Sequence, residues 1–163
     1  MTQTTAPMST AIKVITGLVL VMAAVMLLAG VKVWGLLLGG GLLAAVALFC
    51  YLYAPIAYEL TGAELTVRLR LGRKVFPAVT GCSTLSARPP MGLRLWGNGG
   101  LFAATGIFWN KAYGVFRAYV TSARYQDYVL VATRTRKVLI SPQNPAEFVR
   151  AWAASAPAAP PPG

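Results

Sequence analysis

Histidine is absent from the sequence, and acidic side chains are scarce. The 163 residues include four acids and two cysteines. The acids are Glu59, Glu64, Asp127 and Glu147. General acid–base catalysis and metal binding draw on histidine, paired carboxylates or clustered thiolates. We therefore predict that the protein is not an enzyme, with no catalytic residue, no metal site and no cofactor.

Charge of either sign is also sparse. Charged residues make up 12% of the chain and hydrophobic residues 56%, whereas a soluble domain carries about 25% charged residues. This composition argues against an ordinary soluble globule and against disorder, which requires low hydrophobicity.

The net charge of +11 is unevenly distributed. Residues 1–57 contain two lysines and no acid, and residues 58–163 contain thirteen basic and four acidic side chains. A basic half can face nucleic acid or an anionic membrane. Because the other half is apolar, we predict a lipid bilayer as partner and no nucleic acid.

Two long uncharged runs follow a small, polar start at residues 1–11, which we expect to be a flexible tail. Val14–Val31 has 18 residues without charge, and Val33–Ala57 has 25. One helix over residues 14–57 would be about 66 Å long, but the hydrocarbon core is only about 30 Å thick. The sequence therefore predicts a transmembrane hairpin at 12–57, with helices at about 12–30 and 35–57.

The turn of this hairpin is expected where glycine and charge interrupt the apolar runs. The residues assigned to the turn and its interface are Gly30, Lys32, Trp34 and Gly35. A cleaved signal peptide is the alternative for the first run. It is disfavoured because the run is long, only one lysine precedes it and no clear cleavage site follows.

A G-x-x-x-G motif, Gly35 to Gly39, lies in the second run. Small residues at this spacing allow helix backbones to approach closely. The motif is compatible with dimerisation or with packing of the two hairpin helices on each other, and we favour packing within the hairpin.

After residue 58 the pattern changes to short alternating segments. In Leu65–Leu71, apolar and polar residues alternate with the period of a strand. Seven strands are predicted, at residues 56–60, 65–71, 74–79, 82–87, 115–121, 128–133 and 137–141.

One helix is expected to close this domain. Asn144 is a suitable N-cap, Pro145 stands at the first helical position and Glu147 lies three residues after the cap. We expect Phe148 and Trp152 to pack into the end of the β-structure. Residues 153–163, rich in alanine and proline, are expected to be disordered.

Between the fourth and fifth predicted strands lies Arg88–Tyr113, rich in glycine and aromatics. An unstructured loop of this length is uncommon and usually functional. The segment is expected to insert into a membrane interface, to cover an open edge of the β-structure or to dock on the helices, with internal packing favoured. The candidate partner surface consists of Trp96, Phe102, Phe108, Trp109 and Tyr113.

These elements together resemble a membrane-anchored bacterial pleckstrin-homology-like (PH-like) protein. The resemblance is carried by YELTGAELTVRLRLGRKVFP, RLWGNGGLFAATGIFWNKAYGVFRAYVT and VLISPQNPAEFV. It implies an α+β membrane protein in which the hairpin precedes a PH-like domain at 58–152. That domain would be a seven-strand β-barrel or sandwich capped by one C-terminal α-helix.

Four cations close to the first predicted β-hairpin form a candidate contact for anionic lipid or phosphate. They are Arg68, Arg70, Arg73 and Lys74. In eukaryotic relatives of the family that the chain resembles, basic residues around this hairpin bind inositol phosphates. The alternative is a solvated strand face that acts only as a topology signal.

These same cations lie within 20 residues of the second apolar run. The positive-inside rule then predicts a multi-pass protein of the bacterial inner membrane with a cytoplasmic C-terminal domain. The expected function is a non-catalytic, membrane-tethered binding or scaffolding module, with anionic headgroups and a membrane or cytoplasmic protein as partners. The alternative is an accessory or regulatory subunit that joins a larger membrane complex through its hairpin.

Overall fold

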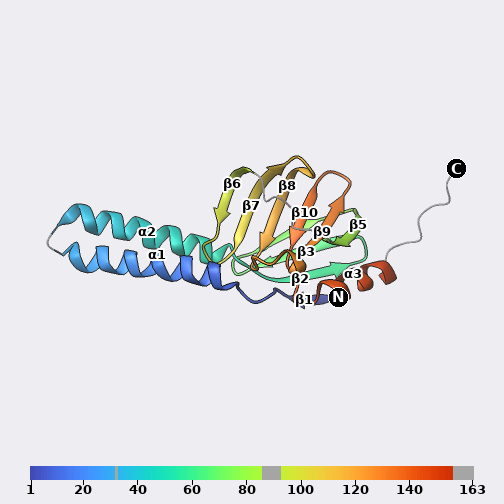
Figure 1. The fold of residues 1–163 in the computed structure, drawn as a ribbon, viewed down its shortest axis with the longest axis horizontal. Helices are drawn as coiled ribbons and strands as arrows, with labels where there is room; N and C mark the ends of the chain where they lie inside the picture. Colours follow the sequence, from blue (N-terminus) through green and yellow to red (C-terminus); the bar gives the residue numbers. More distant parts are fainter. Residues whose placement is uncertain (32, 86–92, 156–163) are drawn as a thin grey trace.

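The computed structural model describes residues 1–31, 33–85 and 93–155. Two long helices form a hairpin that projects from one end of a β-sandwich, and a third helix lies near the opposite end (Figure 1). The helices are α1 (Thr10–Ala29), α2 (Trp34–Leu52), α3 (Pro145–Ser155) and the short 3-10 helix η1 (Tyr125–Asp127).

The strands form two sheets rather than a closed barrel. The four-stranded sheet has the order β1-β2-β3-β4 and the six-stranded sheet the order β5-β9-β10-β8-β7-β6. The first sheet contains β1 (Thr2–Thr4), β2 (Pro55–Thr61), β3 (Glu64–Leu69) and β4 (Arg73–Phe76). The second contains β5 (Val79–Thr84), β6 (Leu93–Gly99), β7 (Ala104–Asn110), β8 (Gly114–Val120), β9 (Val129–Thr133) and β10 (Lys137–Ile140).

The two hairpin helices are each long and apolar enough to cross a membrane. Helices α1 and α2 pack closely at two glycines of α2. A Cβ on Gly40 would lie 3.0 Å from the backbone nitrogen of Leu27, and one on Gly39 would touch the end of the Met26 side chain. The expected packing of one helix on the other is thereby confirmed, although Gly35 of the motif faces open space.

Helix α2 ends at Leu52, five residues before the predicted end. Ala54 precedes Pro55, and the residue before proline disfavours the helical region. The carbonyl oxygen of Leu52 instead accepts a hydrogen bond from the Leu71 N–H, at 2.9 Å. The chain therefore leaves the helix directly into β2.

The expectation of a flexible N-terminal tail is wrong, because Thr2–Thr4 forms β1. This strand pairs antiparallel with β2, and the N-terminal ammonium donates to the Leu60 carbonyl at 2.7 Å. Further on, the Ala6 carbonyl accepts a 2.6 Å hydrogen bond from the Thr121 hydroxyl. An open strand edge offers unpaired backbone groups, and the first residues satisfy those of β2.

Arg88–Tyr113 is also not an unstructured loop. Its described part forms the β6–β7 hairpin, in which Gly97 lies directly opposite Gly106. Both glycines have positive φ, 115° and 150°, and a Cβ on either would collide with the backbone of the other strand. The glycines that suggested a loop are therefore the residues that allow the backbones of β6 and β7 to approach closely at this pair.

The predicted strand over 74–79 is interrupted by Pro77 and Ala78. Proline cannot donate to a sheet ladder, and Ala78 has a φ of 56°. The chain turns here from β4 into β5, which is how it passes from one sheet to the other.

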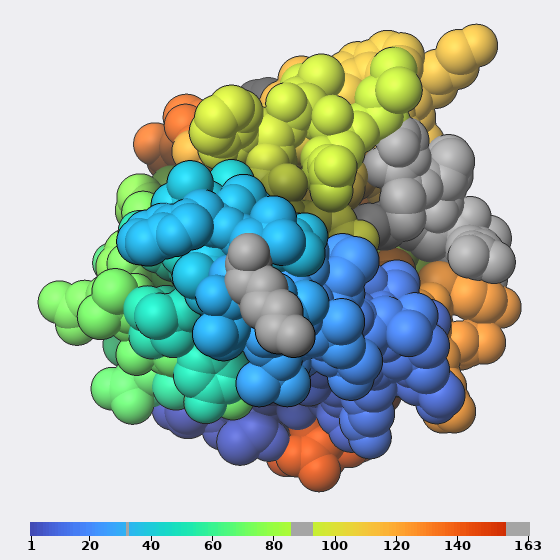
Figure 2. Space-filling model, turned by 90° about the vertical axis from the view of Figure 1, so that its left-hand side faces the viewer, coloured from blue at the N-terminus to red at the C-terminus, as the bar shows by residue number. Residues whose placement is uncertain are grey.

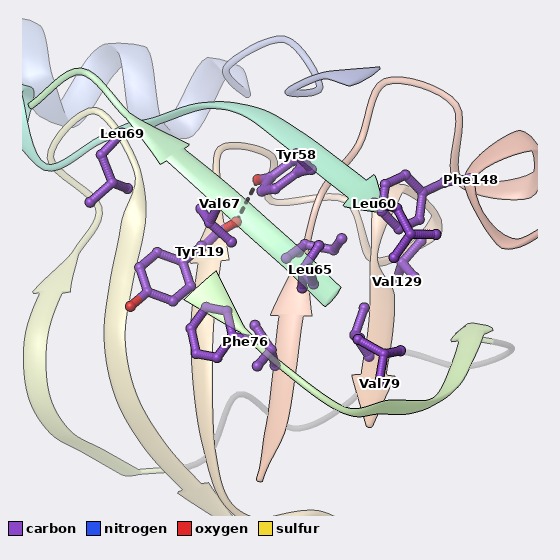
Figure 3. Packing of buried hydrophobic residues seen from close by; sticks show 13 residues of the cluster. Tyr58, Leu60, Leu65, Val67, Leu69, Phe76, Val79, Tyr119, Val129 and Phe148 are labelled. Carbon is purple, nitrogen blue, oxygen red and sulfur yellow. Dashed lines mark hydrogen bonds between the residues drawn. The ribbon is translucent and has the colours of Figure 1, made fainter. Parts of the chain in front are cut away.

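The main core lies between the two sheets and beneath α3 (Figure 3). Tyr58 is completely buried, and its hydroxyl donates to the Tyr119 carbonyl at 2.5 Å. Phe148 of α3 is also completely buried beside Leu60 and Val129, as the sequence predicted. Trp152 packs against the same core but is only partly buried.

Helix α3 continues to Ser155, whose hydroxyl donates to the Trp152 carbonyl at 3.1 Å. Residues 153–155, assigned to a disordered tail, are thus helical, because alanine has the highest helix propensity. Residues 156–163 lie outside the described part of the chain.

Candidate binding groove

The six-stranded sheet is wider than the sheet that covers it, and this leaves a groove at the hairpin end of the sandwich. The inner face of β6–β8 forms one side, and β3, β4 and the last turns of α2 form the other. The groove has a volume of about 760 Å³. Seen along the hairpin from its tip, the yellow-green β6 stands beside the helices rather than behind them (Figure 2).

Two glycines belong to the lining of the groove. Gly97 and Gly106 both line it, and a Cβ on either would meet the backbone of the neighbouring strand. Around them the lining is largely apolar, with Phe49 from α2, Leu95 from β6 and Ile107 from β7. Phe49 and Leu95 remain 59% and 55% exposed, so this apolar lining is open to a ligand.

Three cations line the groove: Lys74 from the first sheet, and Arg94 and Arg117 from the second. Lys74 of β4 pairs in register with the fully buried Val67, which places it on the inner face of its sheet. Arg117 of β8 shares the inner face of the other sheet with the core residue Tyr119. Lys74 and Arg117 also border a smaller hollow of about 310 Å³, which reaches Arg136 in the β9–β10 turn.

No acid lines either hollow within the described residues. Glu59 is engaged elsewhere, 2.8 Å from Arg68. Asp127 accepts a 2.5 Å hydrogen bond from the Ser122 hydroxyl in the η1 region. Since Glu64 and Glu147 lie at the β2–β3 turn and in α3, the groove cations have no local countercharge.

The four cations predicted as one cluster are divided between the faces of the first sheet. Arg68 and Arg73 are paired in register on the outer face, and Arg68 is bound to Glu59. Arg70 lies over the ring of Tyr51, with its guanidinium carbon 4.2 Å from the ring centroid. Of the four, Lys74 alone lines the groove.

The predicted aromatic surface is divided as well. Phe108 is 4% exposed and stacks on Phe116 in a second core on the far face of the six-stranded sheet, so its assignment to a surface is wrong. Tyr113 packs edge-on against Phe116. Trp96 and Trp109 stay exposed, at 78% and 39%.

Phe102 connects the β6–β7 turn to the hairpin. Its N–H donates to the Thr16 hydroxyl of α1 at 3.0 Å, and its ring meets that of Tyr51 of α2 edge-on, at 5.2 Å between centroids. Membrane insertion, covering of a strand edge and docking on the helices were the three placements expected for this segment, and Phe102 docks on the helices. The sandwich and the hairpin base are therefore in direct contact.

At the far end of the hairpin, Gly30 and Trp34 flank the turn between α1 and α2. A Cβ on Gly30 would collide with Leu37, and Trp34 is 81% exposed. Lys32, assigned to the same turn, lies outside the described residues.

No catalytic arrangement is evident in the described part of the chain. Burial raises the pKa of the Cys82 thiol from 9.0 to about 12, which makes it a poor nucleophile at neutral pH. Burial also raises the pKa of Tyr58. Among the described residues, no three His, Cys, Asp or Glu side chains lie close enough together to hold a metal ion.

Sequence reasoning missed Arg117 as a groove residue. The signal was present in β8, where Arg117 stands between Val115 and Tyr119 on the face that alternation assigns to the core. A charge on such a face indicates an edge, a pairing or a cavity. Which of these applies depends on where the neighbouring sheet ends.

Comparison with known proteins agrees with this architecture. A family model described as the bacterial PH domain matches residues 56–155, more than half of the chain and nearly all of the sandwich. No curated protein and no solved structure matches the chain. By its strands, its closing helix and this match, the chain belongs to the bacterial PH-domain family.

Proposed function

We propose that this protein is a non-catalytic binding module tethered to the cytoplasmic face of a bacterial inner membrane. The two apolar helices cross the membrane as a hairpin, and the PH-like sandwich binds at the membrane surface. Membership of the PH-domain family supports a binding or scaffolding role.

The observation that carries the proposal is the packed junction between sandwich and hairpin. At this junction the Tyr51 ring contacts Phe102 edge-on and lies beneath the Arg70 guanidinium, and the Phe102 N–H donates a hydrogen bond to Thr16 of α1. Aromatic and basic side chains are enriched where helices leave the hydrocarbon core. Aromatic and basic residues at the point where the helices meet the sandwich are what we expect of a domain held directly on the membrane surface.

Orientation follows from the charges on either side of the hairpin. Arg68, Arg70, Arg73 and Lys74 follow α2 closely, whereas Lys32 is the only charged residue between the helices. The positive-inside rule therefore favours a cytoplasmic sandwich, with the N-terminus on the same side. Placement of the N-terminus on the same side as the sandwich also agrees with the fold, because β1 at the N-terminus pairs with β2 of the sandwich.

Permanent anchoring removes the need for tight lipid affinity, so we also propose a protein partner. In-register Leu93, Trp109 and Val115 form an exposed apolar row across β6–β8. Tryptophan is enriched at interaction hot spots. This row is the surface that we assign to such contacts.

A second candidate role, as a subunit of a larger membrane complex, is favoured by the helix surfaces. Gly35 and Gly41 face open space rather than α1, so another helix can approach α2 there. Crosslinking in native membranes separates the roles. Crosslinks lost in Trp109→Ala support the sandwich row, whereas crosslinks lost only in Gly41→Leu support the hairpin as the interface.

Reporter fusions test the orientation. A fluorescent protein at the C-terminus of the full chain should be bright and alkaline phosphatase at the same position inactive, with the protein retained in membranes washed with alkaline carbonate. Active phosphatase with a dark fluorescent fusion would overturn the cytoplasmic assignment. Release by carbonate would overturn the membrane tether.

A further inference from the structure

We propose that the groove between α2 and β6–β8 holds one anionic phospholipid. Its phosphate lies between Lys74 and Arg117, and an acyl chain lies along Phe49, Leu95 and Ile107. This inference rests on the proposed membrane anchoring and names a ligand for the sandwich. It differs from the contact predicted at the first β-hairpin, whose other three cations lie away from the groove.

The position of the groove favours a lipid. Phe49, Cys50 and Tyr53, from the last turns of α2 and the residue after it, line the groove wall. If α2 spans the bilayer, this wall is at the level where hydrocarbon gives way to headgroups. A lipid of the same leaflet then reaches the groove without its acyl chain crossing water.

The size and lining favour an amphiphile. A volume of about 760 Å³ lies within the range of about 300–1,000 Å³ that is typical of small-molecule sites. Leu95 and Trp96 on the rim are 55% and 78% exposed, and their burial by an acyl chain is favourable at about 25 cal/mol per Å². A sugar or a free phosphate would leave this apolar surface uncovered.

Charge favours an anionic headgroup. Lys74 faces the groove from one sheet, Arg94 and Arg117 line it from the other, and the lining contains no acid. Cations beside an apolar channel complement a phosphate ester joined to a hydrocarbon chain.

The experiment uses the full chain purified in a non-ionic detergent. Phosphatidylglycerol with a photoactivatable acyl chain is compared with phosphatidylcholine carrying the same chain. The readouts are the lipid retained in native mass spectra and the labelled residues. We expect phosphatidylglycerol to label β6–β7 around Leu95 and Ile107, and phosphatidylcholine to label these positions weakly.

The variants separate the groove from general surface charge. Lys74→Gln combined with Arg117→Gln should reduce phosphatidylglycerol binding about thirtyfold, the effect of two charges near a lipid surface. Arg73→Gln is the matched control, because Arg73 adjoins Lys74 but lies on the outer face. It should bind as the unmodified protein does. Leu95→Asp should remove acyl labelling of β6–β7, and each variant should unfold at the unmodified temperature.

Several results would overturn the inference. One is equal labelling by both lipids, and another is a loss in Arg73→Gln as large as in the double variant. Displacement by glycerol phosphate alone would indicate a free-phosphate site, and displacement by an acidic peptide would indicate a peptide groove. The assay needs no membrane orientation. Absent groove labelling beside a bright fluorescent fusion therefore rejects the lipid site and leaves the proposed function standing.

Discussion

Phe148→Ala should destabilise the sandwich far more than Trp152→Ala, although tryptophan is the larger side chain. Phe148 is 0% exposed and lies among Leu60 and Val129 (Figure 3), whereas Trp152 packs at the margin of the same core. Replacement of a fully buried phenylalanine by alanine costs about 3–5 kcal/mol, since the cavity collapses only partly.

For a domain of this size, 1 kcal/mol shifts the unfolding temperature by about 4–8 °C. A loss of about 3 kcal/mol therefore predicts a fall of about 12–24 °C for Phe148→Ala. The unfolding temperature of Trp152→Ala should fall by less than half as much, because the exposed part of the Trp152 side chain contributes nothing to the stability of the folded state.

The measurement is thermal unfolding of the full chain in detergent, in which the unfolded fraction of the sandwich at each temperature is determined from its susceptibility to proteolysis. The full chain is required because β1 belongs to the first sheet, and a fragment beginning at residue 58 would lack it. Equal shifts for the two variants, or a larger shift for Trp152→Ala, would refute the placement of Phe148 in the core.

Two further predictions concern the hairpin β6–β7 and the buried thiol. Gly97→Ala should lower the free energy of unfolding by about 1–3 kcal/mol, because Gly97 has a positive φ and its Cβ would meet Thr105. The same change should abolish the hydrogen-exchange protection of β6. Gly62→Ala is the control: Gly62 also has a positive φ but faces open space, so β6 should stay protected. If the amides of β6 remain protected from hydrogen exchange in Gly97→Ala, the close approach of the two strand backbones at Gly97 and Gly106 is contradicted. Because burial raises the pKa of Cys82 to about 12, the folded state keeps the thiol protonated. The contribution of Cys82 to stability should therefore be constant below about pH 9 and be lost progressively between about pH 9 and 12. Cys82→Ala should reduce this alkaline loss in pH-dependent unfolding, and an unchanged profile would contradict it.

The local pattern of the sequence was sufficient for much of the fold. Long uncharged runs predicted α1 and α2, because a helix of that composition requires an apolar environment along its whole length. Strict alternation located β3, and short strand-like segments between turns located β2, β8, β9 and β10 to within a few residues. Capping residues and one apolar face predicted α3 and the burial of Phe148. In each case the signal lies within one element.

Only the tertiary structure decided the rest. Thr2–Thr4 has no strand pattern, and it becomes β1 because β2 leaves an edge to be paired. Gly97 and Gly106 read as loop residues until they face each other across two strands. Lys74 and Arg117 come from separate sheets and border one groove because the six-stranded sheet extends beyond its partner. Pairing, close approach and cavities depend on which edges and faces other segments leave unoccupied, and that is a property of the assembled chain rather than of local sequence.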